Sequence, residues 1–213
     1  MKQTTTTKIG RLLVVCLWML MSYSSYAQNP TYELYVTNQL QTDPKTYQFD
    51  VYLLRTGSTD LVLYGVQFGL GIDTSISNGG TLSYTYVSGS TQLNATQAAF
   101  TNQFVTTYFN VGGVIYRYFN QSAVAASTTS SATLISGVKN GCSSPGTRLG
   151  TYRITNTVNF KPASTCKHIF SGTAAASGRT GTKVSAWVNE ETVWSDVYSK
   201  KPVEYLEAIS RGE

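Results

Sequence analysis

Hydrophobic and polar residues alternate along most of this chain, in short runs separated by glycine, asparagine and serine. In 31–36 the apolar side is formed by Tyr32, Leu34 and Val36, and in 46–54 every odd-numbered position from Tyr47 to Leu53 is apolar. A period of two residues is typical of strands with one buried face. We expect about nine strands, drawn from candidate ranges 31–36, 46–54, 61–72, 81–87, 104–109, 114–119, 133–135, 148–155, 168–170 and 183–188.

The stretch 61–72 combines alternation with several glycines. The alternation predicts that six residues face inward: Val62, Tyr64, Val66, Phe68, Leu70 and Ile72. Gly65, Gly69 and Gly71 would then lie on the opposite face. Glycine inside a strand often marks a bulge or a close approach of another segment.

Turn signals recur between the runs, for example Asn78-Gly79-Gly80 and the sequence Asn-Val-Gly-Gly at 110–113, which predicts a hairpin. Convincing helical periodicity is missing from the predicted domain. Short strands with frequent turns favour an all-β fold. We therefore expect a single domain over 28–195, folded as a two-sheet antiparallel β-sandwich of jelly-roll type.

The N-terminal segment has the pattern of a secretory signal peptide. Lys2, Lys8 and Arg11 precede an apolar run at 12–21, and small and polar residues follow as far as Ala27. We expect residues 1–27 to be this signal, with cleavage after Ala27 and a secreted or cell-surface location. The run is shorter than the ~20 residues that a membrane span needs, so the mature chain is predicted to have no transmembrane segment. A lipoprotein signal and a buried helix of a cytosolic protein are the alternatives.

Charge and composition argue against two classes of protein, disordered chains and nucleic-acid-binding proteins. Only 13% of the residues are charged and 12% are aromatic, which argues against a disordered chain. The net charge of +5 falls to +2 once the three basic residues of the signal leave. Because basic residues do not cluster, we expect no nucleic-acid partner.

Removal of the signal leaves two cysteines, Cys142 and Cys166. An even pair in an exported chain predicts one disulfide, and the alternative is two free thiols or a metal pair. His168 lies two residues from Cys166 and is the only histidine. Two cysteines and one histidine are a poor ligand set, so we expect no metal here and a surface position for His168.

Candidate catalytic groups are sparse. A glycosidase needs two facing carboxylates, but the acidic residues fall at turns or on outward strand positions: Glu33, Asp50, Asp60, Asp73, Glu190, Glu191 and Asp196. We expect no catalytic residues and no cofactor, and a glycoside hydrolase is the least favoured function. Oxygen ligands at Asp60, Asp73 and Asn78 leave a structural calcium open, although calcium prefers six to eight oxygens.

Four stretches in order, 47–53, 64–70, 145–157 and 182–188, carry a family resemblance. They resemble the cohesin-like β-sandwich of exported proteins from bacteria that use type IX secretion, a fold shared with carbohydrate-binding modules. The resemblance implies a non-catalytic binding module. Polysaccharide is the leading ligand, and a cohesin-like protein–protein adhesion or scaffold role is the alternative. The tail 196–213 departs from the family, which usually continues into a sorting domain, so it is either the end of a stand-alone module or the start of a further segment.

A sugar-binding site requires aromatic rings that face solvent and can pack against the sugar. Alternation places Tyr35 and Tyr52 outward on their strands and points Trp187 away from its apolar neighbours, while Trp194 lies beyond the last strand. These four are the candidate ligand-binding residues. The alternative is that a loop or the tail covers them, so that they belong to the core.

Overall fold

The computed structural model describes residues 30–98, 100–137, 145–162, 166–172, 181–188 and 191–192, with the backbone alone at 100–107, 188 and 191–192. The predicted signal peptide, Cys142, Trp194 and the tail 196–213 lie outside these residues. None of the helices in the described ranges is long and apolar enough to cross a membrane.

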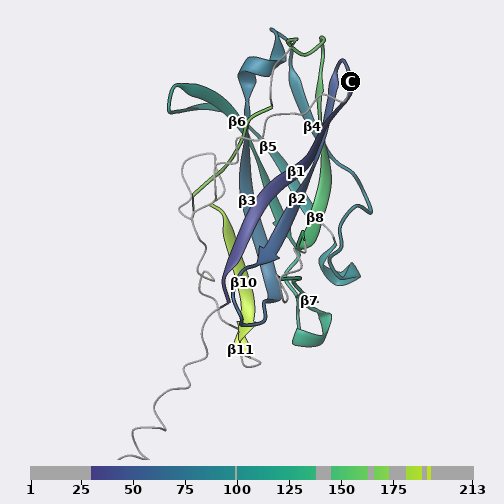
Figure 1. The fold of residues 1–213 in the computed structure, drawn as a ribbon, viewed down its shortest axis with the longest axis vertical. Coiled ribbons are helices and arrows are strands. Elements are labelled where there is room, and N and C mark those ends of the chain that lie inside the picture. The colour runs from purple at the N-terminus through teal and green to yellow at the C-terminus, as the bar shows by residue number, and fades with distance from the viewer. Residues whose placement is uncertain are drawn as a thin grey trace, which may run out of the picture.

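Two antiparallel sheets pack face to face (Figure 1). The first sheet has the strand order β1 (Tyr32–Asp43), β2 (Thr46–Arg55), β8 (Thr147–Asn156) and β4 (Leu82–Tyr86). The second sheet has the order β11 (Glu191–Thr192), β10 (Lys183–Val188), β3 (Val62–Asp73), β6 (Val114–Ala123) and β5 (Phe100–Val111), and β7 (Thr133–Leu134) and β9 (His168–Phe170) also pair with β3.

The chain changes sheet between β2 and β3, β3 and β4, β4 and β5, β7 and β8, and β8 and β9, which is the connectivity of a jelly roll. Short 3₁₀ turns at Thr74–Ser77, Ala95–Gln97 and Thr129–Ser131 complete the described structure. The predicted all-β, two-sheet antiparallel sandwich is confirmed.

The core lies between the sheets and is filled as the alternation predicted in β1 and β2. Tyr32, Leu34 and Val36 are buried, as are the four odd-numbered residues of β2 from Tyr47 to Leu53. Tyrosine fills part of this core: Tyr152 is fully buried, and its ring centroid lies 5.4 Å from that of Tyr84. The high tyrosine content therefore serves the fold in large part.

The start of β3 contradicts the predicted pattern. Leu61 and Leu63 are fully buried, whereas Val62 and Tyr64 are only half-buried. In the pairing with β10, Ser185 lies opposite Gly65 but Ala186 lies opposite Leu63, so β3 holds one extra residue there. Such a β-bulge shifts the alternation by one residue. The predicted inward positions from Val66 to Ile72 hold, but Val62 and Tyr64 were assigned to the wrong face.

The hairpin predicted at 110–113 joins β5 to β6. Gly112 and Gly113 have φ angles of +58° and +86°, values that suit glycine far better than other residues. The Asn110 side-chain oxygen accepts a hydrogen bond from the Gly113 N–H at 2.9 Å. The turn chemistry thus explains why this pair of strands could be recognised from sequence.

Candidate ligand-binding faces

The outer face of the first sheet holds two of the four predicted aromatic residues. Tyr35 and Tyr52 are opposite each other in the β1–β2 register, and their rings stack with centroids 5.9 Å apart. Tyr52 is only 8% exposed, and the Tyr35 hydroxyl donates to the Pro145 carbonyl. Both rings point outward as predicted, but they are packed and hydrogen-bonded rather than presented as an open platform.

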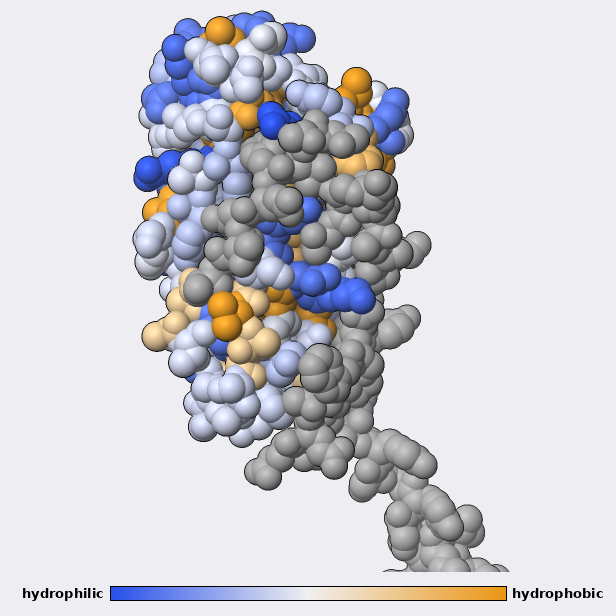
Figure 2. All heavy atoms as spheres, turned by 180° about the vertical axis from the view of Figure 1, so that it is seen from behind, coloured by the Kyte–Doolittle hydropathy of each residue, from blue (hydrophilic) through white to orange (hydrophobic). Residues whose placement is uncertain are grey.

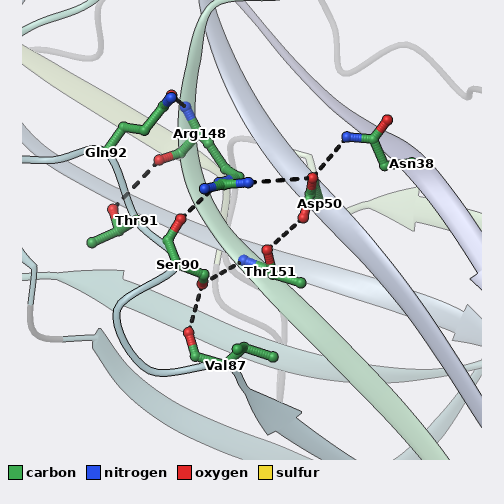
Figure 3. A network of polar contacts seen from close by, with 8 residues as sticks. All are labelled: Asn38, Asp50, Val87, Ser90, Thr91, Gln92, Arg148 and Thr151. Atoms are coloured by element: carbon green, nitrogen blue, oxygen red, sulfur yellow. Dashed lines mark hydrogen bonds and ion pairs between the residues drawn. The ribbon is translucent and has the colours of Figure 1, made fainter.

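Beside these rings lies a polar network centred on Asp50 (Figure 3). The Asp50 carboxylate accepts hydrogen bonds from Asn38 Nδ2 at 2.7 Å and from Thr151 Oγ1 at 2.5 Å, and Arg148 Nη1 lies 3.8 Å away. Asp50 points outward as alternation predicted, but it is only 6% exposed, which the sequence did not indicate. A buried carboxylate needs such partners, and the network supplies them.

The same network fixes the loop that follows β4. Arg148 Nε donates to the Ser90 carbonyl at 2.7 Å, and Ser90 Oγ accepts from the Thr151 N–H at 2.8 Å (Figure 3). Gln92 Oε1 accepts from the Arg148 N–H at 2.7 Å. The polar groups on this face therefore satisfy one another and hold the loop against β8.

The outer face of the second sheet holds a different pair of rings. Trp187 of β10 and Tyr64 of β3 meet edge to face, with centroids 5.5 Å apart, and both are half-buried. Trp187 is opposite Val62, which is in turn opposite Leu134 of β7, so the three share one face. Leu134 is 59% exposed. Figure 2 shows the molecule from behind, where apolar side chains gather in the lower half among more hydrophilic ones.

A hollow lies next to this ring pair. Its volume is about 170 Å³, and it is lined by Tyr64, Gly65, Val66, Gln67, Ser122, Ala123, Lys183 and Ser185. Pockets for drug-sized ligands enclose roughly 300–1,000 Å³, so this one suits a single ring or end group. Its polar lining offers an ammonium, two hydroxyls and an amide.

The bulge in β3 explains why the hollow forms here. A Cβ built at Gly65 would meet nothing closer than Ala125 at 3.9 Å, so the floor is open above the backbone. Hydrogen bonds hold the segments on either side of the hollow in place. Ala126 N–H donates to the Tyr64 carbonyl at 2.8 Å, and Gln67 Nε2 donates to the Gly181 carbonyl at 3.1 Å.

The four predicted ligand-binding residues do not form one platform. Tyr35 and Tyr52 lie on the first sheet, Trp187 lies on the second, and Trp194 lies outside the described residues. Tyr64, the ring that contacts Trp187, was missed because simple alternation assigned it to the core. The glycine next to it, Gly65, was the signal in the sequence that a bulge was present.

Cys166 and His168 lie in the core. Cys166 is a free thiol that is 2% exposed, and its Sγ is 3.6 Å from Nε2 of His168, which is 6% exposed. The surface position expected for His168 was wrong. Burial raises the pKa of the Cys166 thiol and lowers the pKa of His168 to about 3, so both are neutral near pH 7. The predicted disulfide with Cys142 is not formed in this structure, since Cys166 is a free thiol there, and Cys142 itself lies outside the described residues.

The acidic candidates that the structure describes have structural partners. Asp60 forms an ion pair with Arg55, and Asp73 Oδ1 accepts from the Ser75 N–H at 2.8 Å at the start of a 3₁₀ turn. Asn78 Nδ2 donates to the Asn159 carbonyl at 3.4 Å. Within the described ranges, no group of three or more histidine, cysteine or acidic residues is arranged to hold a metal ion.

No family model matches this chain, and no curated protein matches it.

Proposed function

We propose that this protein is a secreted, non-catalytic binding module that binds polysaccharide on the outer face of its second sheet. The observation that carries the proposal is the Tyr64–Trp187 ring pair at the edge of a hollow lined by hydroxyl, amide and amine groups. Aromatic rings pack on the apolar faces of sugar rings, while nearby polar groups hydrogen-bond the hydroxyls. The aromatic rings and the polar groups both lie on strands, and sites built on strands are more rigid than sites on loops, which favours a preformed site.

The non-catalytic part of the proposal has separate support. A nucleophilic cysteine requires a thiolate and a basic partner, whereas burial keeps the Cys166 thiol protonated and makes His168 a poor base. Asp50, Asp60 and Asp73 are each engaged in contacts that stabilise the fold. The cohesin-like resemblance and the jelly-roll connectivity also fit a binding module.

A protein ligand is the second candidate, and one observation favours it. Leu134 is 59% exposed and Val124 is 47% exposed, and Leu134 shares the face of Trp187. Exposed aliphatic side chains beside aromatic rings are common at protein interfaces. This candidate predicts an adhesion or scaffold role at the same face.

The test is a binding assay of the purified protein on a glycan array, followed by calorimetric titration with the oligosaccharides that bind. Trp187→Ala and Tyr64→Ala are expected to weaken binding at least tenfold. Tyr108→Ala is the matched control, because Tyr108 is 59% exposed near the other end of the second sheet. Its affinity should equal that of the wild type.

Binding that survives both Trp187→Ala and Tyr64→Ala would overturn the site. A silent array would overturn the carbohydrate proposal. If a partner protein then co-purifies and is lost on Trp187→Ala or Leu134→Ser, the protein-binding function replaces it.

A further inference from the structure

Among the described residues that line the hollow, Lys183 is the only charged one. Its side chain is exposed. The carboxylates of Asp50, Asp60 and Asp73 contact other residues. A lysine ammonium has three donors and no acceptor. The hollow therefore offers a positive charge that none of its described lining residues neutralises.

The other polar groups of the lining extend this donor character. Ser122 and Ser185 contribute hydroxyls, which can donate or accept, and the Gln67 amide nitrogen is already donating to Gly181. The lining residues that the structure describes include no carboxylate. The two hydroxyls and the Gln67 amide oxygen can also accept hydrogen bonds, so they suit the hydroxyls of a sugar, and the Lys183 charge is the feature that favours an anionic group on that sugar.

These groups are placed by strand pairing rather than by loops. Lys183 lies opposite Gln67, and Gln67 lies opposite Ser122, so the three form a row across β10, β3 and β6. Ser185 follows Lys183 by two residues and faces the same side. Strands are spaced about 4.8 Å apart, so the row spans about 10 Å, comparable with one sugar ring and its substituents.

From this arrangement we propose that the hollow recognises an acidic sugar residue, one whose ring carries a carboxylate or another oxyanion. The inference rests on the proposed function and adds the ligand class. The oxyanion lies against the Lys183 ammonium and the serine hydroxyls, and the sugar ring lies against Tyr64. Charge-assisted hydrogen bonds of this kind are about twice as strong as neutral ones.

The experiment compares two ligands of equal size, an oligogalacturonate and its fully methyl-esterified form, by calorimetry with the whole protein. We expect the acid to bind at least tenfold more tightly at low salt, with a smaller difference at high salt because salt screens the charge. A sulfated oligosaccharide of the same length forms a third arm. Binding of the sulfated ligand shows general oxyanion recognition, and its failure to bind shows selectivity for a carboxylate.

Variants separate the charge from the rest of the site. Lys183→Gln should bind acid and ester equally, and Lys183→Arg should keep the preference. Lys45→Gln is the control, since Lys45 is an exposed lysine at the turn between β1 and β2 of the first sheet. Equal affinity of the wild type for acid and ester, or a preference that Lys183→Gln leaves intact, would overturn the inference and leave sugar binding standing. Failure of every glycan would overturn the proposed function itself.

Discussion

On the outer face of the first sheet, Tyr35 and Tyr52 stack on each other beside a closed network around Asp50. On the outer face of the second sheet, Tyr64 and Trp187 meet at the edge of an open hollow. Both faces combine tyrosine with polar side chains on rigid strands. They differ in that a polar network closes the first face, whereas the second face borders an open hollow.

Two local features account for this difference. A loop after β4 lies over β8 on the first sheet, and its Ser90 and Gln92 take up the donors of Arg148 and Thr151. On the second sheet, the bulge at Gly65 brings Tyr64 to the outer face and leaves space above the backbone. Outward orientation on a strand is therefore a weak indicator of a binding site unless the partners of the side chain are known.

The largest expected effect tests the first face. Asp50→Ala removes the acceptor for Asn38 and Thr151 and the partner of Arg148. We expect the free energy of unfolding to fall by about 3 kcal/mol, because buried donors and a half-exposed guanidinium lose their counterpart. Urea denaturation measures this. Glycan affinity of the folded variant should not change.

Asp43→Asn is the control, since Asp43 is an exposed acid in the β1–β2 turn. A loss for Asp50→Ala no larger than for this control would mean that the network does not stabilise the first face.

The next effect concerns the core beneath the second sheet. His168 has a folded-state pKa of about 3 because of burial, against about 6.5 in the unfolded chain. The unfolded chain thus takes up a proton below pH 6.5 that the folded protein does not. This contribution to stability is complete above pH 6.5 and is lost as the pH falls towards 3, at up to about 1.4 kcal/mol per pH unit.

Denaturation curves between pH 6.5 and 5 measure this slope with little interference from surface carboxylates. In His168→Phe the slope over that interval should largely disappear. A slope equal to that of the wild type would show that another group causes the acid sensitivity, and the position of His168 would then need revision.

The smallest expected changes in stability come from substituting two glycines on β3. Gly71 tests tight packing, and Gly65 tests the hollow. A Cβ at Gly71 would lie 2.8 Å from Ile169 Cγ2 and from Tyr118 Cζ, so Gly71→Ala should lower the free energy of unfolding by about 1–2 kcal/mol. A Cβ at Gly65 has its nearest neighbour at 3.9 Å, so Gly65→Ala should change it by at most about 0.5 kcal/mol. The added methyl group would however fill the floor of the hollow and weaken glycan binding. A larger loss of stability for Gly65→Ala than for Gly71→Ala would contradict the packing described for the two glycines. Unchanged glycan binding by Gly65→Ala would contradict the hollow as the site.

Much of the fold was accessible from sequence because alternation reports directly on which face of a strand is buried. It identified the inward residues of β1 and β2, and the Asn-Val-Gly-Gly turn of the β5–β6 hairpin. It failed at Val62 and Tyr64, where one extra residue reversed the alternation. The surface position expected for His168 was wrong, and the burial of Asp50 on its outer face was not foreseen, since polarity alone does not reveal burial when local partners or a neutral state make burial possible.

The sequence by itself determined the class of fold, the turns and the supply of aromatic and polar residues on the outer faces. Only the tertiary structure decided which face borders a hollow. It brought Lys183, Gln67 and Ser122 together from three separate strands, and it closed the first face with a loop. The physical reason is that a period of two residues encodes orientation within one strand, whereas a binding site depends on register, bulges and contacts between strands that are distant in sequence.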